Sequence, residues 1–297
     1  ASANAISYLG ADPLLIDIDK SSWQMDLDLL ETFLSNECKL DNFNALVHLK
    51  TSRKISALMI VHVQGNMCDM DRLLAICNHY NLPVLEDAAE ALGSKYKKEY
   101  AGTIGHIGCF SFNGNKIMST GGGGMIVSTN SEYLKKAKHL TTTAKRDSLT
   151  YFHDEVGFNY RLVNVLAAIG VAQLEQLDTF LASKKNIASY YKDNLQGVGD
   201  IEFQLALDSV QPNEWLFTIT TSSMEELLDY LNTNGVMSRP FWIPMNQLPM
   251  YSDKIYINSN DVSATVHRAA LSIPCSTSIL DSDLEKVVDT IKSFYRK

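Results

Sequence analysis

The sequence of 297 residues lacks several features that would assign it to a class of protein at once. Its five cysteines are odd in number and show no CxxC spacing, which argues against a disulfide framework and against a zinc site. No apolar run approaches the roughly 20 residues of a membrane helix, and no basic segment followed by an apolar one opens the chain as a signal peptide would. We therefore expect a cytoplasmic protein with reduced thiols and no metal.

Positive charge is also scarce. The chain carries 26 lysines and arginines against 34 aspartates and glutamates, a formal net charge of −8, and no dense basic cluster. Nucleic acid is not an expected partner, because phosphate backbones require a basic face. A small anionic ligand is compatible with this charge, since it needs only a nest of backbone N–H groups and one or two cations.

Glycine-rich nucleotide motifs are incomplete. The run at 121–124 (GGGG) is not followed by GK[ST], and the segment 102–108 (GTIGHIG) lacks GxGxxG order, so nucleotide hydrolysis and dinucleotide binding are weakly supported. The run at 121–124 is either backbone packed closely near a neighbouring lysine or an ordinary flexible loop.

What is present is an α/β pattern. A helix is expected over 69–80 with Asp69 as its cap, and it alternates with short apolar runs. This order predicts a mostly parallel, buried sheet. The expected strands are 14–18, 57–63, 84–87, 107–112 and 125–128.

The pattern becomes helical from residue 131, and the amphipathic stretch 180–195 is expected to link two domains. We predict a large domain over 1–180, with an N-terminal portion missing ahead of Ala1. Residues 181–297 are expected to form the linker helix and a smaller α+β domain. The other expected elements are helices at 131–140, 162–177, 223–234, 261–270 and 281–295, and a strand at 215–221.

Two side chains near predicted strand ends carry candidate chemistry. Asp87 ends an apolar strand, where open parallel sheets place a ligand crevice; taken alone, this position favours a helix N-cap as the alternative. Lys116 follows small and polar turn residues after the next strand, where its amine could approach a cofactor; alternatively it is a solvated loop lysine. Pyridoxal phosphate (PLP) chemistry needs a lysine and an acid that keeps the ring nitrogen protonated, and these two residues can supply them.

Several segments closely resemble the DegT/DnrJ/StrS family of sugar aminotransferases. The resemblance covers essentially the whole chain, and its motifs are specific as a set. They are 84–93 (VLEDAAEALG), 105–116 (GHIGCFSFNGNK), 120–124 (TGGGG), 157–162 (GFNYRL), 167–174 (AAIGVAQL), 239–242 (RPFW) and 249–251 (PMY).

The resemblance implies PLP fold type I and a homodimer with active sites between subunits. It implies that Lys116 is the Schiff-base lysine and that Asp87 is the partner of the pyridine nitrogen. Ser111 would bind the cofactor phosphate, and Asn159 would reach that phosphate from the neighbouring subunit. Otherwise Ser111 is a strand-end hydroxyl and Asn159 a turn residue. Glu90 stands where many members have a glutamine near the ring hydroxyl, or it is a first-turn helix carboxylate.

The remaining candidates concern the substrate. Asn246 lies where members of the family often carry a histidine. Members also normally have an N-terminal Gly-Thr phosphate loop and an aromatic residue stacked on the cofactor ring, and this sequence contains neither. His62 could approach the pocket or be a packed histidine. Tyr160 and Arg161 could contact substrate phosphates or hold a helix start.

The expected reaction moves an amino group, with glutamate as the donor, to a 4-keto-6-deoxy sugar carried on a nucleotide. One alternative is a sugar dehydratase, but in such members the lysine is replaced, and Lys116 is present here. Another is an inactive PLP-binding relative that serves as a sensor or partner subunit, against which the intact Asp87 and Lys116 argue. The sequence leaves the sugar, keto position, nucleotide and amino donor open.

Overall fold

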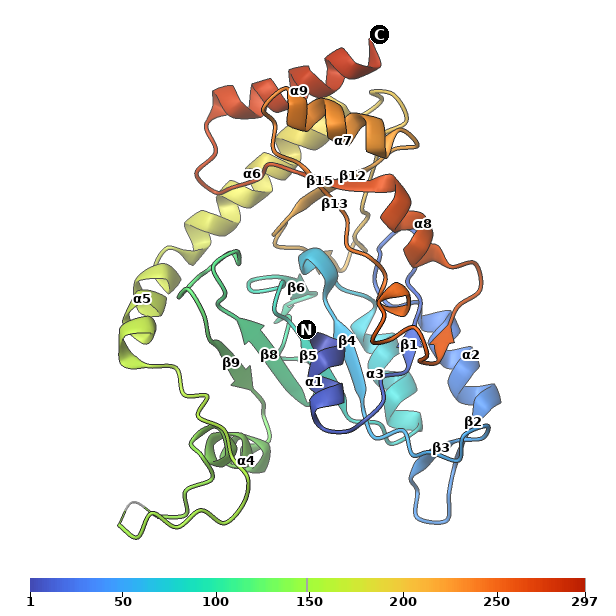
Figure 1. The fold of residues 1–297 in the computed structure, drawn as a ribbon, viewed down its shortest axis with the longest axis vertical. Helices are drawn as coiled ribbons and strands as arrows, with labels where there is room; N and C mark the ends of the chain where they lie inside the picture. Colours follow the sequence, from blue (N-terminus) through green and yellow to red (C-terminus); the bar gives the residue numbers. More distant parts are fainter. Residues whose placement is uncertain (148, 297) are drawn as a thin grey trace.

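A four-stranded sheet forms the centre of the lower part of the molecule in the computed structural model, which describes residues 1–147 and 149–296 (Figure 1). Its strands lie in the order β4 (Leu58–Val61), β5 (Val84–Asp87), β8 (Ile107–Ser111) and β9 (Gly124–Val127). The first three are parallel, and β9 is antiparallel to β8. The sheet is therefore mostly parallel, as the alternation of apolar runs and helices predicts.

Two helices pack beside this sheet, and aspartates begin both. In α3 (Met70–His79) the Asp69 carboxylate accepts a hydrogen bond from the Arg72 N–H, as the sequence predicts. In α2 (Leu27–Glu37) the Asp26 carboxylate accepts from two first-turn N–H groups. Their apolar faces join the strands in one buried cluster. This cluster includes Leu30, Leu34, Ile60, Leu73, Cys77 and Val84.

The expected strand at 14–18 does not belong to the central sheet. Only β1 (Leu15–Ile16) is extended, and it pairs in parallel with β14 (Tyr256–Ile257). The Asp17 carboxylate that follows accepts from the first two N–H groups of α8 (Val262–Ala269), so this segment is bonded to the C-terminal part of the chain instead. The prediction that residues 14–18 add a strand to the main sheet is wrong.

The C-terminal part has its own antiparallel sheet and core. The order is β10 (Glu202–Phe203), β12 (Phe217–Thr220), β15 (Ala270–Ile273) and β13 (Arg239–Pro240). The long helix α6 (Leu177–Leu195) leads into it, and α7 (Met224–Thr233) and α9 (Asp281–Tyr295) lie at the top of Figure 1. A second buried cluster, with Tyr191, Ile219, Leu227, Leu271 and Ile291, fills the space between them.

Short elements complete the described chain. They are α1 (Ser2–Tyr8), the hairpin of β2 (Cys38–Leu40) and β3 (Leu46–His48), the sheet of β6 (Lys95–Tyr96), β7 (Glu99–Tyr100) and β11 (Val210–Gln211), and two 3-10 helices (Val63–Gly65 and Met245–Gln247).

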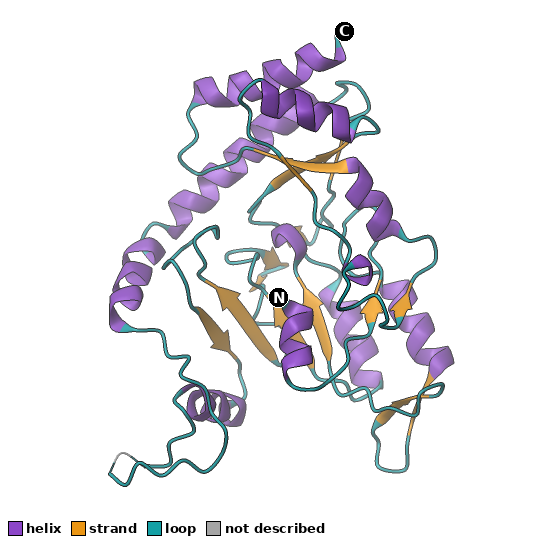
Figure 2. Cartoon of the chain, in the orientation of Figure 1, coloured by secondary structure: helices purple, strands orange, loops and turns teal. Residues whose placement is uncertain are grey.

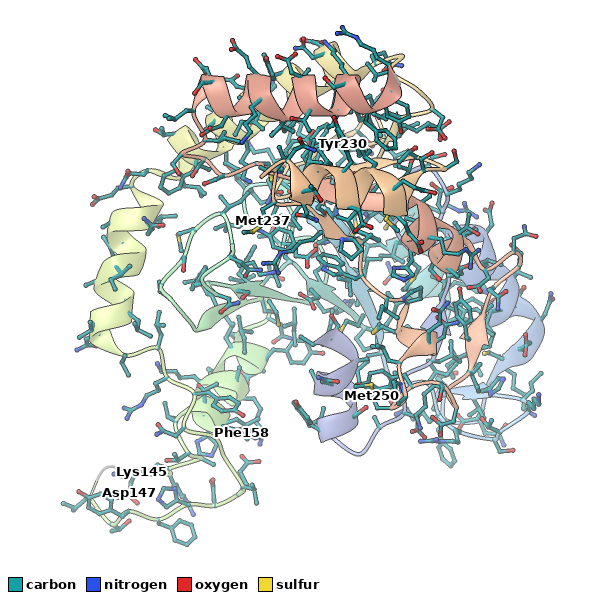
Figure 3. All side chains as sticks on the ribbon, turned by 45° about the horizontal axis from the view of Figure 1, so that its top comes forward. Lys145, Asp147, Phe158, Tyr230, Met237 and Met250 are labelled. Carbon is teal, nitrogen blue, oxygen red and sulfur yellow. The ribbon has the colours of Figure 1, made fainter. Side chains whose placement is uncertain are left out.

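One segment projects from this body. After α4 (Ser131–Thr141) the described chain forms a loop over 142–147 and 149–163, which we name the arm, before α5 (Asn164–Leu174) begins (Figure 2). Lys145 and Asp147 lie near its tip and Phe158 closer to α4 (Figure 3). No residue of α4 or α5 is buried, although α5 is almost entirely apolar.

Among the described residues, no single helix has the length and apolar composition of a membrane span, and only α5 and α6, bent by 58° at their junction, reach both criteria when taken as a pair.

Candidate active site

Asp87 and Lys116 lie at the carboxyl ends of neighbouring parallel strands. Asp87 is the last residue of β5, opposite Cys109 of β8, and Lys116 lies in the turn that follows β8. This edge is where open α/β sheets hold ligands. No helix begins after Asp87; its carboxylate accepts from the Ala89 N–H at 3.1 Å within a turn. The alternative that Asp87 caps a helix is therefore wrong.

The Lys116 ammonium is enclosed on two sides. Its Nζ lies 3.8 Å from Oε1 of Glu90 and 4.0 Å from the centre of the Trp215 ring, and only 14% of the side chain is exposed. A surface lysine is normally far more exposed. The structure therefore does not support the solvated loop lysine that was the alternative for this position.

Glu90 is a buried carboxyl group with an altered acidity. Burial raises its pKa to about 7, and the negative charge of Asp87 adds to this, while the Gln64 N–H bond and the Lys116 charge oppose it. Gln64 donates its backbone N–H to Oε2 at 2.8 Å. Glu90 lies in a turn and not in a helix. Near neutral pH this group can therefore either accept or donate a hydrogen bond.

Asp87 and Ser111 present polar atoms at the same strand ends. The second carboxylate oxygen of Asp87 accepts from the Ser2 hydroxyl at 2.6 Å, which brings α1 against this edge of the sheet. The Ser111 hydroxyl accepts from the Asn113 N–H at 3.3 Å. A lysine amine, a strand-end carboxylate and a hydroxyl thus share one edge, which is the set of groups that PLP requires for its carbonyl carbon, ring nitrogen and phosphate.

His62 lies beneath this edge rather than in it. Its side chain is fully buried, and its Nε2 lies 2.8 Å from Oε2 of Glu86. Burial by itself would raise the pKa of Glu86, but the His62 bond and several backbone N–H groups outweigh that effect and lower it. The backbone N–H of His62 donates to the backbone carbonyl of Asp87 at 3.1 Å. These contacts favour the packed histidine over a substrate ligand, because no surface of the ring is exposed.

Three other candidates lie in the arm. Asn159 pairs with Thr142 in an isolated bridge, Tyr160 stacks on Phe158 with ring centres 5.0 Å apart, and Arg161 is exposed. Helix α5 begins at Asn164, so Tyr160 and Arg161 do not form its start. All three residues are exposed, on a segment that projects from the body.

Asn246 lies on a different segment, in the 3-10 helix Met245–Gln247, and is half-buried. The chain reaches this helix from Trp242, whose ring centre is 6.1 Å from that of Trp215. The segment therefore starts beside the residue that contacts Lys116, and its position agrees with a substrate contact without showing one.

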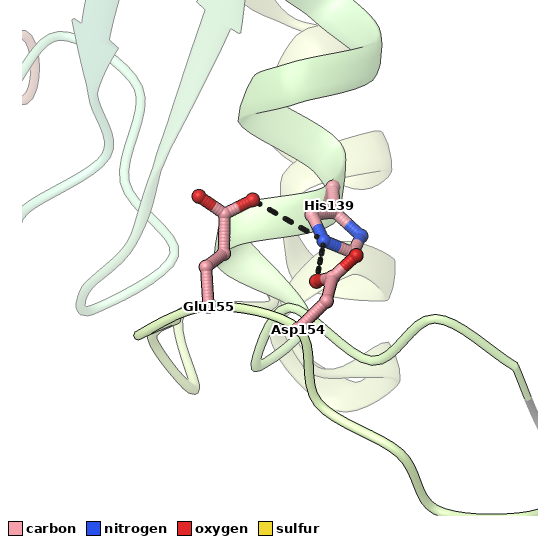
Figure 4. Close-up of side chains that lie close together, drawn as sticks. All are labelled: His139, Asp154 and Glu155. Atoms are coloured by element: carbon pink, nitrogen blue, oxygen red, sulfur yellow. Dashed lines mark hydrogen bonds and ion pairs between the residues drawn. The ribbon is translucent and has the colours of Figure 1, made fainter.

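A group of metal-ligating types occurs at the base of the arm (Figure 4). Ligand atoms of His139, Asp154 and Glu155 lie within 4.8 Å of one another, but the carboxylates are exposed. Lys136 donates to Glu155 at 2.5 Å, and His139 Nε2 lies 2.7 Å from Asp154. The Lys136 ammonium thus neutralises part of this negative charge.

The structure also adds Trp215 and Gln64 to the site, and neither stood out in the sequence. Trp215 is separated from Lys116 by about a hundred positions, and Gln64 acts through its backbone N–H. A contact between distant segments and a bond from a backbone N–H leave no local sequence pattern, so neither residue could be found from the sequence.

The model of the DegT/DnrJ/EryC1/StrS aminotransferase family matches residues 1–292. A GDP-perosamine synthase of Escherichia coli O157:H7 is 34% identical over 99% of this chain and 76% of its own length. A UDP-4-amino-4,6-dideoxy-N-acetyl-beta-L-altrosamine transaminase of Campylobacter jejuni is 29% identical over 100% of this chain and 77% of its own length. An aminotransferase structure from Brucella abortus superposes with a TM-score of 0.90 at 22% identity, covering 100% of this chain and 77% of that one.

The fold and the strand-end site define a PLP-dependent sugar aminotransferase of fold type I. The chain belongs to the DegT/DnrJ/EryC1/StrS aminotransferase family.

Proposed function

We propose that the protein transfers an amino group from glutamate to a 4-keto-6-deoxy sugar carried on a nucleotide. The observation that carries this proposal is the pairing of Lys116 and Asp87 at one sheet edge in a chain of this family. The names of its relatives supply the substrate class. An amino group on carbon 4 of a 4,6-dideoxy sugar, as in the Campylobacter jejuni relative's name, is what amination of a 4-keto-6-deoxy sugar gives.

The proposed roles are those that the family resemblance implies for these positions. Lys116 would hold the carbonyl carbon of the cofactor, Asp87 would keep a proton on its ring nitrogen, Glu90 would lie beside its ring hydroxyl, and Ser111 would bind its phosphate. Bound PLP supplies a sink for the electron pair left on the reacting carbon. The freed amine of Lys116 would act as the general base that moves a proton between the substrate carbon and the cofactor carbon. The low exposure of Lys116 keeps water from competing for that proton.

We also propose that two copies of the chain form a homodimer through the arm and α5. Many apolar side chains in this region are exposed. Monomeric proteins rarely expose large apolar patches, so a second copy of the chain is expected to cover them. Asn159, Tyr160 and Arg161 would then complete the partner's site. The exposed apolar residues include Leu149, Tyr151, Phe152, Val156, Val165, Ile169, Val171 and Leu174.

The proposed domain division follows the two larger buried clusters; a third, smaller one packs Trp23 against Phe241, Val266 and Ala270. One cluster draws nearly all of its members from residues 27–101, and the other from residues 187–291. This distribution supports a large domain over 1–180 and a linker helix with a smaller domain over 181–297.

The proposed reaction is tested by the absorbance spectrum of the full-length gene product with PLP, before and after glutamate is added, beside the Lys116→Ala variant. We expect a visible band that requires Lys116 and that glutamate converts to the pyridoxamine form. Addition of a nucleotide-linked 4-keto-6-deoxy sugar should then restore the original band. A spectrum that does not depend on Lys116 contradicts the proposal, and an inactive PLP-binding protein becomes the better account.

A further inference from the structure

Trp215 contacts Lys116 from the C-terminal half of the chain. The residue lies just before β12, and only 4% of its surface is exposed. The Lys116 Nζ lies 4.0 Å from the ring centre, within the range in which an aromatic face attracts an ammonium group. The indole N–H donates to the carbonyl of Asn115 at 2.7 Å, so the same side chain also holds the backbone next to the lysine.

The backbone of Trp215 is fixed on both sides. Its N–H donates to Oδ1 of Asn213 at 3.0 Å, and its carbonyl accepts from Nζ of the buried Lys184 at 2.7 Å. Lys184 also donates to the carbonyl of Cys275 at 2.5 Å. Because these bonds anchor the backbone of Trp215, the packing of the C-terminal part determines where the ring can lie.

We infer that Trp215 is a positioning residue for Lys116, whose ring face holds the free ammonium and whose N–H holds the turn that carries it. Glu90 lies on another side of the same ammonium, at 3.8 Å, and the negative charge of Asp87 acts on Glu90 in turn. These are the charged groups that face Lys116 in the described chain.

The consequence of this arrangement rests on the proposed function. In transamination the amine of the amino donor displaces the lysine, which must stay within reach of the reacting carbon until it is needed again. A free lysine side chain has many rotamers, so a defined resting place shortens the search for the productive one. The contacts of the ammonium with the Trp215 ring and with Glu90 provide that resting place.

The test uses PLP-free protein and two substitutions that both remove the indole N–H. Trp215→Phe keeps an aromatic face, whereas Trp215→Leu does not. Trp242→Phe is the matched control, because it removes an indole that neighbours Trp215 and makes no described contact with Lys116. Thermal unfolding would verify that each variant is folded.

The readout is the rate of reductive methylation of Lys116, followed by mass spectrometry from about pH 7 to about pH 11, which brackets the ordinary lysine range. The exposed Lys98 serves as the internal reference. Only the neutral amine reacts, so loss of the ring face should move the midpoint of the pH–rate curve downward. We expect a shift of about 0.4 to 1 pH unit for Trp215→Leu and a smaller one for Trp215→Phe, with none for the control. A change in access alone alters the plateau and not the midpoint.

An unchanged midpoint in Trp215→Leu, or equal shifts in the Phe and Leu variants, would overturn the inference that the ring face holds the ammonium. Neither result depends on catalysis, because no cofactor or substrate is present. Failure of this inference is therefore distinguishable from failure of the proposed reaction, which the glutamate-dependent spectrum tests.

Discussion

The strand-end site and the arm differ in how far their side chains are buried within the chain. Around Lys116 the ammonium, the carboxyl of Glu90 and the indole of Trp215 are largely buried, and the carboxyl and the indole both lie beside the ammonium. In the arm, Tyr151 and Val156 are 72% and 87% exposed, and Asn159, Tyr160 and Arg161 are exposed as well. One region is enclosed within the chain, whereas the other leaves apolar side chains exposed that the proposed dimer would cover.

This difference separates two halves of the proposed chemistry. Cofactor handling needs groups held in fixed positions, and one chain provides these at its sheet edge. Closing the site over a phosphate or a substrate needs groups that approach from elsewhere. A second copy of the arm provides such groups if the chain forms a dimer with shared sites.

The largest expected effect comes from the carboxylate within the strand-end site. Asp87→Asn cannot carry the negative charge that holds a proton on the ring nitrogen, so we expect the glutamate-dependent conversion to slow by about 10²- to 10³-fold. Stopped-flow absorbance measures this rate. Asp229→Asn, an exposed carboxylate on α7, should react like the unmodified protein. A rate for Asp87→Asn within a few-fold of the unmodified protein would contradict the role of this carboxylate.

The next prediction asks whether the arm completes a neighbouring site. We expect Lys116→Ala and Asn159→Ala each to be impaired, and a reassorted mixture of the two to recover activity. Half of the dimers would be hybrids with one intact site each, so about a quarter of all sites should work. A mixture of Lys116→Ala and Asp87→Ala should recover nothing, since both residues lie in one chain's site. Absence of recovery in the first mixture would show that Asn159 serves its own chain.

The sequence predicts local features well because local chemistry causes them. Asp69 begins α3 because its carboxylate satisfies a free N–H of the first turn, and β5 is an apolar run that ends in polar residues. The position of Lys116 after β8 follows from the same logic. Its chemical role was predicted from the family resemblance as well.

Contacts between distant segments could not be predicted in this way. The apolar run at 14–18 is suited to any sheet, and its pairing with β14 depends on residues more than two hundred positions away. Helix α2 was not expected, although Asp26 caps it. For Trp215 the sequence shows only a large residue near a strand, and its contact with Lys116 depends on how the C-terminal part packs.

A charge placed on α5 should weaken the proposed dimer. Val171 is 59% exposed on a helix that is apolar on nearly every side, and Val171→Glu would bury an unpaired carboxylate if a second copy covers it. We expect sedimentation to show a dimer dissociation constant at least about tenfold higher. Leu280→Glu is the control, since this leucine is 65% exposed just before α9, outside the proposed interface. Equal association of the two variants would place the interface elsewhere.

The smallest expected effect is the pH dependence contributed by Glu90. Its pKa rises from an ordinary 4.5 to about 7 in the folded protein, so the folded state holds this proton more tightly than the unfolded state does. Glu90 therefore costs no stability below about pH 4.5 and weakens the fold progressively as the pH rises to about 7, by up to roughly 3 kcal/mol.

Glu90→Gln removes this titration while keeping an acceptor for the Gln64 N–H. In urea unfolding of the PLP-free protein, the stability of the variant relative to the unmodified protein should be greater at pH 8 than at pH 5. Because the ion pair with Lys116 is also lost, the absolute difference at either pH is less informative than its change between them. If that difference is the same at both pH values, Glu90 is ionised throughout, and the ammonium of Lys116 compensates its burial more fully than a separation of 3.8 Å suggests.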